Sequence, residues 1–461
     1  FDGQSARLAM PAGYGAFLAR FGRLTPIQAE AMPVLLDGRN VVVVAPSASG
    51  KTEAALTPLC ERLSRDPPVR GARLVYVVPT KALSNDIELR ASGPASVLGL
   101  KLVVRTGDRP AALKDGSVDI LVTTPESLDS MLCRIPGVLA TVRALVVDEA
   151  HVLDGTSRGD QMRVLVRRLT RLVFPASAQL VAMSATVADP AGLGRRLLGP
   201  GATVVQAGAP RTLDLRYEPD LATAVAGLRT DGVSKAVIFC NSRRRVETAA
   251  ADLRRKSPWP PERVMVHHAS LSKREREDVE AAFRRWQAGL LVCTTTIELG
   301  VDVGDIDAVV LAGAPPTVES FLQRVGRGCR RKTGMVAVCV PEDDADRLAF
   351  EAIEAEIAAA GAKGTAKGTD TFSRKEKVSV PFADEADLGV AVQQVFSILY
   401  GARGGMSRRD LHGLLSPIAE AADLDEILAH LVATGWVTTA GGGRFFATTA
   451  LMDLGEKGRV H

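Results

Sequence analysis

The residue run best suited to chemistry is Ala45-Pro46-Ser47-Ala48-Ser49-Gly50-Lys51-Thr52. It follows the β-branched run Val41–Val44 and precedes a helical pattern that starts at Glu53. Backbone N–H groups at the start of a helix point at phosphate oxygens, and the helix dipole favours their negative charge. In this arrangement Lys51 reaches the β- and γ-phosphates, and the Thr52 hydroxyl binds Mg²⁺. The spacing therefore predicts a triphosphate site, whereas the structural alternative is an ordinary strand–turn–helix.

Two alanines distinguish this run from a glycine-rich phosphate loop. Ala45 stands where the general pattern has its first glycine, and Ala48 stands where many such loops have another. Alanine disfavours a positive φ, so we expect the loop to close without a left-handed residue at either position.

A second set of reactive side chains lies in the run Val146-Val147-Asp148-Glu149-Ala150-His151. Two adjacent carboxylates at the end of a buried strand are costly unless a cation or a donor satisfies them. We therefore expect Asp148 to hold Mg²⁺ and Glu149 to act as the general base that polarises an attacking water. His151 is a candidate bridge to the next motif, although a lone histidine here is more often structural.

These side chains need strands that end beside them, and the sequence contains two series of such strands. The first series is expected at Val41–Ala45, Leu74–Val78, Leu102–Arg105, Ile120–Thr123, Ala144–Asp148 and Leu180–Met183. After a junction near Gly208–Leu215, the second is expected at Ala236–Phe239, Val264–His267, Leu290–Cys293, Ala308–Leu311 and Val336–Val340. Continuous apolar strands between helices predict parallel sheets that are covered on both faces. Ligands bind at the carboxyl ends of such strands, where both motifs fall.

The last part of the chain has a different pattern. Gly361–Asp370 is rich in glycine, lysine and threonine and is typical of a linker, which we place at 361–384. Helices are then expected at Val392–Leu399, Ser407–Leu415 and Asp423–Thr434, with a hairpin of Val437–Thr439 and Arg444–Ala447 around Gly441–Gly443. This order predicts a winged-helix-like domain over 385–450. A tail at 451–461 follows, and we expect the protein to continue beyond it.

Composition narrows the class of protein. The net charge of +4, from 57 Lys and Arg against 53 Asp and Glu, does not by itself indicate a nucleic-acid partner. Basic clusters nevertheless gather in the middle third, at Arg243–Arg245, Arg254–Lys256, Lys273-Arg274, Arg284-Arg285 and Arg330–Lys332. Aromatic residues make up 4%, which argues against base-stacking platforms. The six cysteines form no CxxC pair, and neither a signal peptide nor a membrane-length apolar run occurs, so we expect reduced thiols in a cytoplasmic protein.

The order of motifs resembles that of superfamily 2 helicases of the DEAH/DEAD-box type. The resemblance begins with Asp148–His151 and Ser184-Ala185-Thr186. The remaining motifs follow in family order at Leu24–Gln28, Pro79–Leu83, Thr123–Ser127, Ile238–Ser242, His268–Ser272, Thr294–Asp302 and Gln323–Arg330. Within the superfamily, Glu298–Asp307, His267–Ser272 and Gly155–Gly159 are similar to the Lhr-type (large helicase-related) enzymes. The resemblance implies an α/β fold with two tandem RecA-like parallel-sheet lobes, at 1–208 and 209–360, before the winged-helix-like domain.

The resemblance also implies roles for individual residues. The implied catalytic residues are Lys51, Asp148, Glu149, Gln323, Arg327 and Arg330. ATP is expected at Thr25, Gln28, Ala45, Ser47, Ala48, Ser49, Gly50, Lys51, Thr52, Glu53, Gly300 and Asp302, with Mg²⁺ at Thr52 and Asp148. The residues expected to couple hydrolysis to movement are His151, Ser184 and Thr186. Nucleic acid is expected at Thr80, Lys81, Thr124, Asn241, Ser242, His268, Ser270, Thr294, Thr295, Arg408, Arg409 and Arg444.

One departure from the family pattern concerns Cys329, which stands where the final motif usually has glycine. It puts in question the turn that presents Arg330.

Three hypotheses of function remain open at this point. The leading one is an ATP-dependent helicase or translocase that moves 3′→5′ on single-stranded DNA and acts in DNA repair. The second is a remodeller of RNA or RNA–DNA hybrids, because no named residue distinguishes the 2′-hydroxyl. The third is an ATP-switched nucleic-acid clamp that does not unwind. For the winged-helix-like domain, packing or protein docking competes with strand contact.

Overall fold

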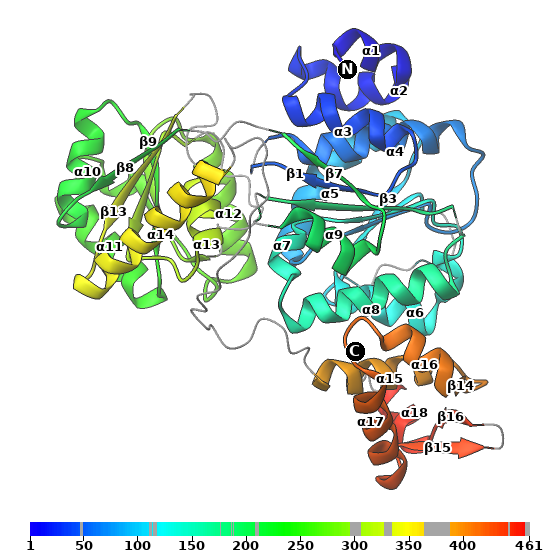
Figure 1. Ribbon diagram of the computed structural model, residues 1–461. Helices are drawn as coiled ribbons and strands as arrows, with labels where there is room; N and C mark the ends of the chain where they lie inside the picture. The colour runs from blue at the N-terminus through cyan, green and yellow to red at the C-terminus, as the bar shows by residue number, and fades with distance from the viewer. Residues whose placement is uncertain are drawn as a thin grey trace. The chain divides into compact units, whose positions relative to one another are not determined.

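The computed structural model describes residues 1–461 except 47–48, 110–112, 114–117, 176, 186, 188, 208–211, 296–305, 327–333, 364–387, 441–442 and 457–461. The chain forms two compact units (Figure 1). The first contains Phe1–Ala45, Ser49–Ala207 and Glu376–His461, and the second contains Pro46–Ala48 and Gly208–Lys375. In the part of the chain that is described, no helix is long and apolar enough to cross a membrane.

The first unit is built on a sheet of seven parallel strands. Their order is β3 (Leu102–Arg105), β4 (Ile120–Thr123), β2 (Leu74–Val77), β5 (Ala144–Val147), β6 (Gln179–Ser184), β1 (Val41–Val44) and β7 (Thr203–Gln206). Every residue of β1, β2, β4, β5 and β6 is buried, as expected for strands covered on both faces. The predicted strands correspond to β1 to β6. The edge strand β7, which is partly exposed, was not predicted.

Some helices of this first lobe follow a strand at its carboxyl end, and the others precede β1 or follow another helix. They are α3 (Pro26–Leu36), α4 (Lys51–Arg65), α5 (Lys81–Val97), α6 (Pro125–Arg134), α7 (Ala150–Leu153), α8 (Ser157–Leu172) and α9 (Pro190–Leu198), after α1 (Gly3–Ala9) and α2 (Pro11–Gly13). The hydroxyls of Thr25, Thr80 and Thr156 accept backbone N–H bonds at the starts of α3, α5 and α8. At the junction of β2 and α5, Thr80 therefore places a polar group at the edge of the sheet where β2 ends.

The second unit repeats this arrangement on a sheet of six parallel strands. Their order is β10 (Val264–His267), β11 (Gly289–Cys293), β9 (Lys235–Cys240), β12 (Ala308–Ala312), β13 (Gly334–Val340) and β8 (Thr212–Tyr217). Its helices are α10 (Leu221–Thr230), α11 (Arg243–Lys256), α12 (Lys273–Arg285), α13 (Val318–Val325) and α14 (Asp344–Lys363). Two RecA-like parallel-sheet lobes are thus confirmed. The stretch that forms β8 has the sequence pattern of a junction, because Asp214 and Arg216, which are exposed, interrupt its apolar residues.

A C-terminal subdomain, residues 388–456, completes the first unit. Its elements are α15 (Leu388–Gly401), β14 (Met406–Ser407), α16 (Arg408–Leu415), α17 (Ala421–Ala433), β15 (Val437–Ala440), β16 (Arg444–Ala447) and α18 (Thr449–Glu456). The strands form an antiparallel sheet in the order β14, β16, β15. The three predicted helices and the hairpin are present, and α18 is an addition. The subdomain packs through α15 and α16 on α6 and α8 of the first lobe (Figure 1).

Four buried polar side chains join the subdomain to the first lobe. Asp129 of α6 and Arg168 of α8 form an ion pair, with 2.8 Å between Oδ1 and Nη1. Ser397 of α15 donates its hydroxyl to Asp129 Oδ1, and Gln394 donates a side-chain N–H to Asp129 Oδ2. Both α15 side chains also accept from Arg168. The subdomain follows the second lobe in sequence, yet its polar anchor lies on the first.

Candidate nucleotide and nucleic-acid site

The predicted phosphate loop lies between β1 and α4. Gly50 precedes the helix with a φ of +89°, a conformation that glycine adopts at little cost. Among the described residues, no side chain caps the first backbone N–H groups of α4. Lys51 is buried and donates from Nζ to the carbonyl of Ala45 at 2.7 Å. Ala45 has no positive φ, in agreement with its side chain, whereas Ser47 and Ala48 lie outside the described residues.

Gln28, which is expected to contact ATP, contacts this loop directly. Gln28 is buried, and its Nε2 donates to the carbonyl of Gly50 at 3.3 Å. Its Oε1 accepts from the backbone N–H of Thr25, while the Thr25 hydroxyl accepts from the N–H of Gln28. This reciprocal capping box fixes the start of α3 against the phosphate loop.

The carboxylate of Asp148 is held at both oxygens. Oδ1 accepts the backbone N–H of Glu149 at 2.9 Å, and Oδ2 accepts the phenol O–H of Tyr76 at 2.6 Å. Burial and the neighbouring Glu149 raise the pKa of Asp148 to about 6, against the lowering effects of Tyr76 and Lys51. A divalent cation would relieve both causes of this increase.

Glu149 adopts an unusual backbone conformation. Its φ is +46°, and no other non-glycine residue in the described ranges has a positive φ. This conformation costs free energy, and Glu149 adopts it between the carboxyl end of β5 and the start of α7. Glu149 Oε2 is buried without a hydrogen-bond partner among the described residues. A buried carboxylate oxygen in this state is available to a ligand or a water molecule.

His151 connects the acidic pair to the end of β6. Its Nδ1 accepts the backbone N–H of Ala185 at 3.3 Å and lies 3.5 Å from Glu149 Oε2. A ring nitrogen that accepts an N–H carries no proton of its own, so this geometry gives no charged pair with Glu149. The adjacent Ser184 hydroxyl is buried without a partner, and Thr186 lies outside the described residues.

The described side chains fit a nucleoside triphosphate with Mg²⁺. In the described part of the first lobe, three buried side-chain oxygens lack hydrogen-bond partners: Ser49 Oγ, Glu149 Oε2 and Ser184 Oγ. They follow or end β1, β5 and β6, which are adjacent in the sheet. Unsatisfied buried polar atoms are costly, so their gathering at one edge indicates a polar ligand. Hydroxyl and carboxylate oxygens, as at Thr52 and Asp148, are ligands that Mg²⁺ prefers.

Two residues of this site escaped the sequence analysis. Tyr76 lies in β2 directly beside Val146 of β5, which brings its phenol to Asp148. Arg90 of α5 donates to Glu53 Oε1 at 2.8 Å, and this pairing holds Glu53 at the start of α4. For Tyr76 a signal was present, because a phenol inside an otherwise apolar central strand requires a buried partner.

The predicted nucleic-acid contacts of the first lobe lie on neighbouring strands. Thr80 follows β2 and caps α5, and Thr124 follows β4 and precedes α6. Since β2 and β4 are adjacent and parallel, the two threonines share one edge of the sheet. Lys81 beside them is exposed and forms an ion pair with Asp108.

The contacts predicted in the second lobe gather in the same way. Asn241 and Ser242 follow β9, His268 and Ser270 follow β10, and Thr294 and Thr295 follow β11. These three strands are adjacent, so the six residues lie at one edge. His268 is buried, with Nε2 on Glu247 and with Nδ1 lacking a partner in the described parts. Ser270 accepts from Arg243 at 2.9 Å, and Ser242 caps α11.

Several predicted residues of the second lobe are differently engaged or are not described. Asn241 donates to the carbonyl of Ala314 and accepts from Arg324, so its amide ties β9 to α13. Gln323 of α13 is buried. Gly300, Asp302, Arg327 and Arg330 lie outside the described residues.

In the C-terminal subdomain, two of the three predicted contacts already have partners. Arg408 forms an ion pair with Asp425, and Arg444 donates to the carbonyls of Gly404 and Gly405. Arg409 is exposed. The neighbouring helix α17 carries no Lys or Arg, and its first turns and the residue before them hold Glu420, Asp423, Asp425 and Glu426.

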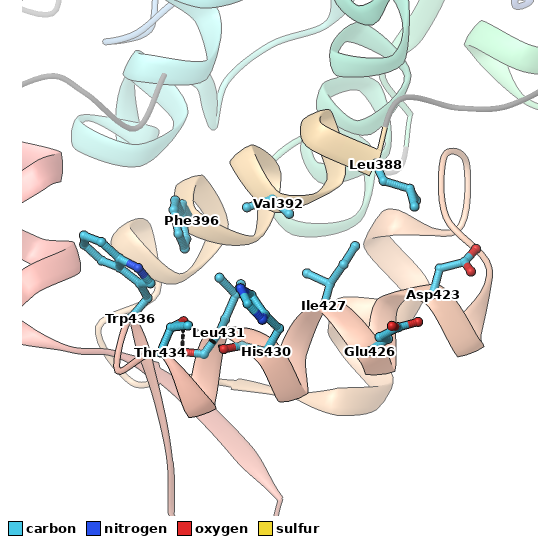
Figure 2. Close-up of a pocket in the computed structure, with 10 residues that line it drawn as sticks. All are labelled: Leu388, Val392, Phe396, Asp423, Glu426, Ile427, His430, Leu431, Thr434 and Trp436. Carbon is cyan, nitrogen blue, oxygen red and sulfur yellow. Dashed lines mark hydrogen bonds between the residues drawn. The ribbon is translucent and has the colours of Figure 1, made fainter. Parts of the chain in front are cut away.

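An apolar groove of about 560 Å³ lies between α15 and α17, and Figure 2 shows its lining. Phe396 and Val392 of α15 face Ile427 and His430 of α17, and Trp436 closes one end. Asp423 and Glu426 stand at the other end. The groove is therefore apolar with an acidic rim, which is opposite in character to a phosphate-binding surface.

Comparison with known proteins identifies the family of both lobes. Residues 25–192 match the DEAD/DEAH box helicase family, and residues 220–332 match the helicase conserved C-terminal domain. A relative from Mycolicibacterium smegmatis, described as Lhr helicase/probable uracil glycosylase, is 31% identical over 378 residues. The chain belongs to the Lhr-type superfamily 2 helicases.

Further matches support this assignment and show that the chain covers only part of the length of these relatives. An ATP-dependent helicase Lhr-Core of Methanothermobacter thermautotrophicus is 30% identical over 375 residues, which are 71% of this chain and 43% of the relative. A structure of Mycobacterium smegmatis helicase Lhr bound to ssDNA and AMP-PNP matches with a TM-score of 0.79 and 27% identity, covering 96% of this chain and 61% of that one. The alignment to the first relative covers 68% of this Lhr-type chain but 25% of the relative.

Proposed function

We propose that this chain is the motor part of an ATP-dependent nucleic-acid helicase or translocase. The observation that carries the proposal is the group of buried, unpartnered oxygens of Ser49, Glu149 and Ser184 beside Lys51. Neither a packed core nor a structural ion pair requires such a group at the ends of three adjacent strands. A triphosphate and its water supply the missing partners.

The residues of the first lobe divide the chemistry between them. Lys51 is positioned to neutralise phosphate charge, and Asp148 with Thr52 would hold Mg²⁺, which when bound supplies a positive charge to the phosphate oxygens. Glu149 Oε2 is buried and without a partner, so it is the group placed to accept a proton from the attacking water. His151 lies beside Glu149 and accepts the backbone N–H of Ala185, which gives a route by which the site senses the end of β6. From the family resemblance we assign Arg327 and Arg330 to the developing phosphoryl charge, and Gly300 and Asp302 to the nucleotide.

Single-stranded nucleic acid is proposed to lie along the junction hydroxyls of each lobe. Thr80 and Thr124 share one edge, and Ser242, Ser270 and His268 share another. Hydroxyl and imidazole groups contact phosphates without reading bases, so binding should tolerate any sequence. DNA is the preferred substrate because the Lhr structure matched above contains ssDNA. Movement in the 3′→5′ direction, a role in DNA repair and a cytoplasmic location are further parts of this proposal.

The C-terminal subdomain has the element order of a winged helix, and we propose that fold for it. Its acidic α17 and the paired state of Arg408 favour packing or protein docking over contact with a strand. This observation supports packing or protein docking as the proposed role of the subdomain. The RNA remodeller and the non-unwinding clamp remain the alternatives for the motor.

Strand displacement distinguishes these functions. The chain is incubated with ATP, Mg²⁺ and duplexes that carry a 3′ or a 5′ single-stranded tail, made of DNA, RNA or both. We expect displacement of 3′-tailed DNA duplexes. Displacement of RNA duplexes alone would favour the remodeller. ATP hydrolysis without displacement of any duplex would refute the helicase and leave a translocase or a clamp.

A further inference from the structure

Tyr76 lies where two elements of the proposed ATP site meet. It is fully buried in β2, beside β5, and its phenol O–H donates to Asp148 Oδ2 at 2.6 Å. The Thr52 side chain of α4 also lies close enough to this phenol to influence its pKa. The phenol therefore bonds to one of the two residues assigned to Mg²⁺, Asp148, and lies near the other, Thr52.

The second oxygen of Asp148 shows why this contact matters. Oδ1 accepts the backbone N–H of Glu149, so its position follows the chain itself. Oδ2 is oriented by a side-chain donor, and among the described residues that donor is Tyr76. Without the phenol, only the Glu149 N–H restrains the carboxylate about its terminal torsion, which is a broad and soft one. The direction of the Oδ2 lone pairs is then less sharply defined.

We propose that Tyr76 is a positioning residue, which orients Asp148 and Thr52 for Mg²⁺ and so sets the metal dependence of nucleotide binding. The inference rests on the proposed ATP site. Tyr76 does not touch the reacting atoms in this assignment. It acts as outer-shell partners of metal ligands do, by fixing the orientation of the groups that bind the ion.

The surroundings of Tyr76 support a role in the site rather than in folding alone. Its strand neighbours Leu74, Val75 and Val77 are apolar and fully buried, so a phenylalanine would satisfy the core equally well. The hydroxyl adds a buried polar atom whose hydrogen-bond partner is Asp148 of the site. Tyr76 also lies within electrostatic reach of Arg90, which holds Glu53 at the start of α4.

The test is Tyr76→Phe in residues 1–461, with Tyr14→Phe as the matched control. Tyr14 lies in the N-terminal helical segment of the same unit and is also buried, so its replacement removes a phenol O–H away from Asp148. A fluorescent non-hydrolysable ATP analogue is titrated against each protein in EDTA and over a range of Mg²⁺ concentrations. Thermal unfolding is recorded for each protein.

The expected result is a change in metal dependence alone. In EDTA, Tyr76→Phe binds the analogue as the wild type does, whereas the Mg²⁺ concentration for half-maximal binding rises roughly 10- to 100-fold. Tyr14→Phe leaves both values unchanged. An unaltered Mg²⁺ dependence in Tyr76→Phe would overturn the proposal.

Two other outcomes would also overturn it, by showing a structural role. These are an equal loss of affinity with and without Mg²⁺, and loss of the unfolding transition in Tyr76→Phe. If the wild type itself binds no analogue in Mg²⁺, the proposed ATP site is wrong and the inference falls with it.

Discussion

Arg168 carries the positive charge that faces Asp129 where α15 packs on α6 and α8, and Arg168→Ala tests how firmly the C-terminal subdomain is held. Both side chains are at most 4% exposed, so the substitution leaves a buried carboxylate without its cation. Removing one partner of a buried pair costs about 3–5 kcal/mol. Asp129 would keep donors from Gln161, Gln394 and Ser397, which places the expected loss near the lower limit, about 3 kcal/mol.

The assay is urea unfolding, followed at Trp436 in a Trp259→Phe, Trp286→Phe background. Trp436 belongs to the C-terminal subdomain, whereas the other two tryptophans lie in the second unit. The control is Arg158→Ala, which breaks an ion pair with Glu126 whose side chains are 41% and 45% exposed. Such a pair contributes about 0–1 kcal/mol. An Arg168→Ala protein that unfolds within about 1 kcal/mol of the wild type would refute the anchor.

The same ion pair predicts a dependence of stability on pH. Burial alone would raise the pKa of Asp129, but Arg168 and hydrogen bonds from Ser397, Gln394 and Gln161 hold it below its ordinary value of 3.8. A depressed pKa in the folded state means that the stabilisation is complete above the ordinary value and is lost as the pH falls through the lower, folded value. The stability advantage of the wild type over Asp129→Asn should therefore shrink below about pH 4. A difference that stays constant from neutral pH to pH 3 would contradict this assignment.

Three further predictions concern the motor. Glu149→Gln should slow ATP hydrolysis roughly 10²–10⁴-fold while nucleotide affinity stays unchanged. Turnover measures the first effect, and binding of a fluorescent analogue measures the second. Turnover at the wild-type rate would exclude Glu149 as the general base. Arg330→Ala should lower hydrolysis by roughly 10³–10⁵ and leave single-strand affinity intact, which fluorescence anisotropy measures; normal turnover would contradict the role taken from the family. Binding of single-stranded DNA should weaken steeply between roughly 50 and 200 mM salt, as expected for phosphate contacts. Unrelated sequences should show similar slopes of affinity against salt concentration. An affinity that does not depend on salt would exclude phosphate contacts.

Much of the fold is predictable from the sequence because buried parallel strands are continuous apolar runs. Val41–Val44 and Ala144–Val147 stand out in this way, and so do the motifs that follow them. The edge strand β7 escaped prediction because only Val205 of its residues is buried, and β8 because its exposed Asp214 and Arg216 alternate with half-buried Leu215 and Tyr217. Edge strands face the core on one side, so their pattern resembles that of a polar loop.

The contacts that hold the site and the subdomain together were harder to predict. Tyr76 and Asp148 are 72 positions apart and meet because β2 and β5 are neighbours in the sheet. Arg168 lies in an arginine-rich helix whose sequence favours a solvated face, yet it is buried against Gln394. Neither pairing has a local signal, because each depends on which elements become neighbours after folding. The packing of residues 388–456 on the first lobe is of the same kind.

The most direct test of the account is the rate of ATP hydrolysis by residues 1–461 in Mg²⁺, measured with and without single-stranded DNA. We expect slow hydrolysis by the protein alone and a large stimulation by DNA of any sequence, which Lys51→Ala abolishes. A protein that hydrolyses no ATP under either condition, or whose rate is indifferent to nucleic acid, would contradict the proposal that the strand ends of β1, β5 and β6 form the catalytic centre of a nucleic-acid motor.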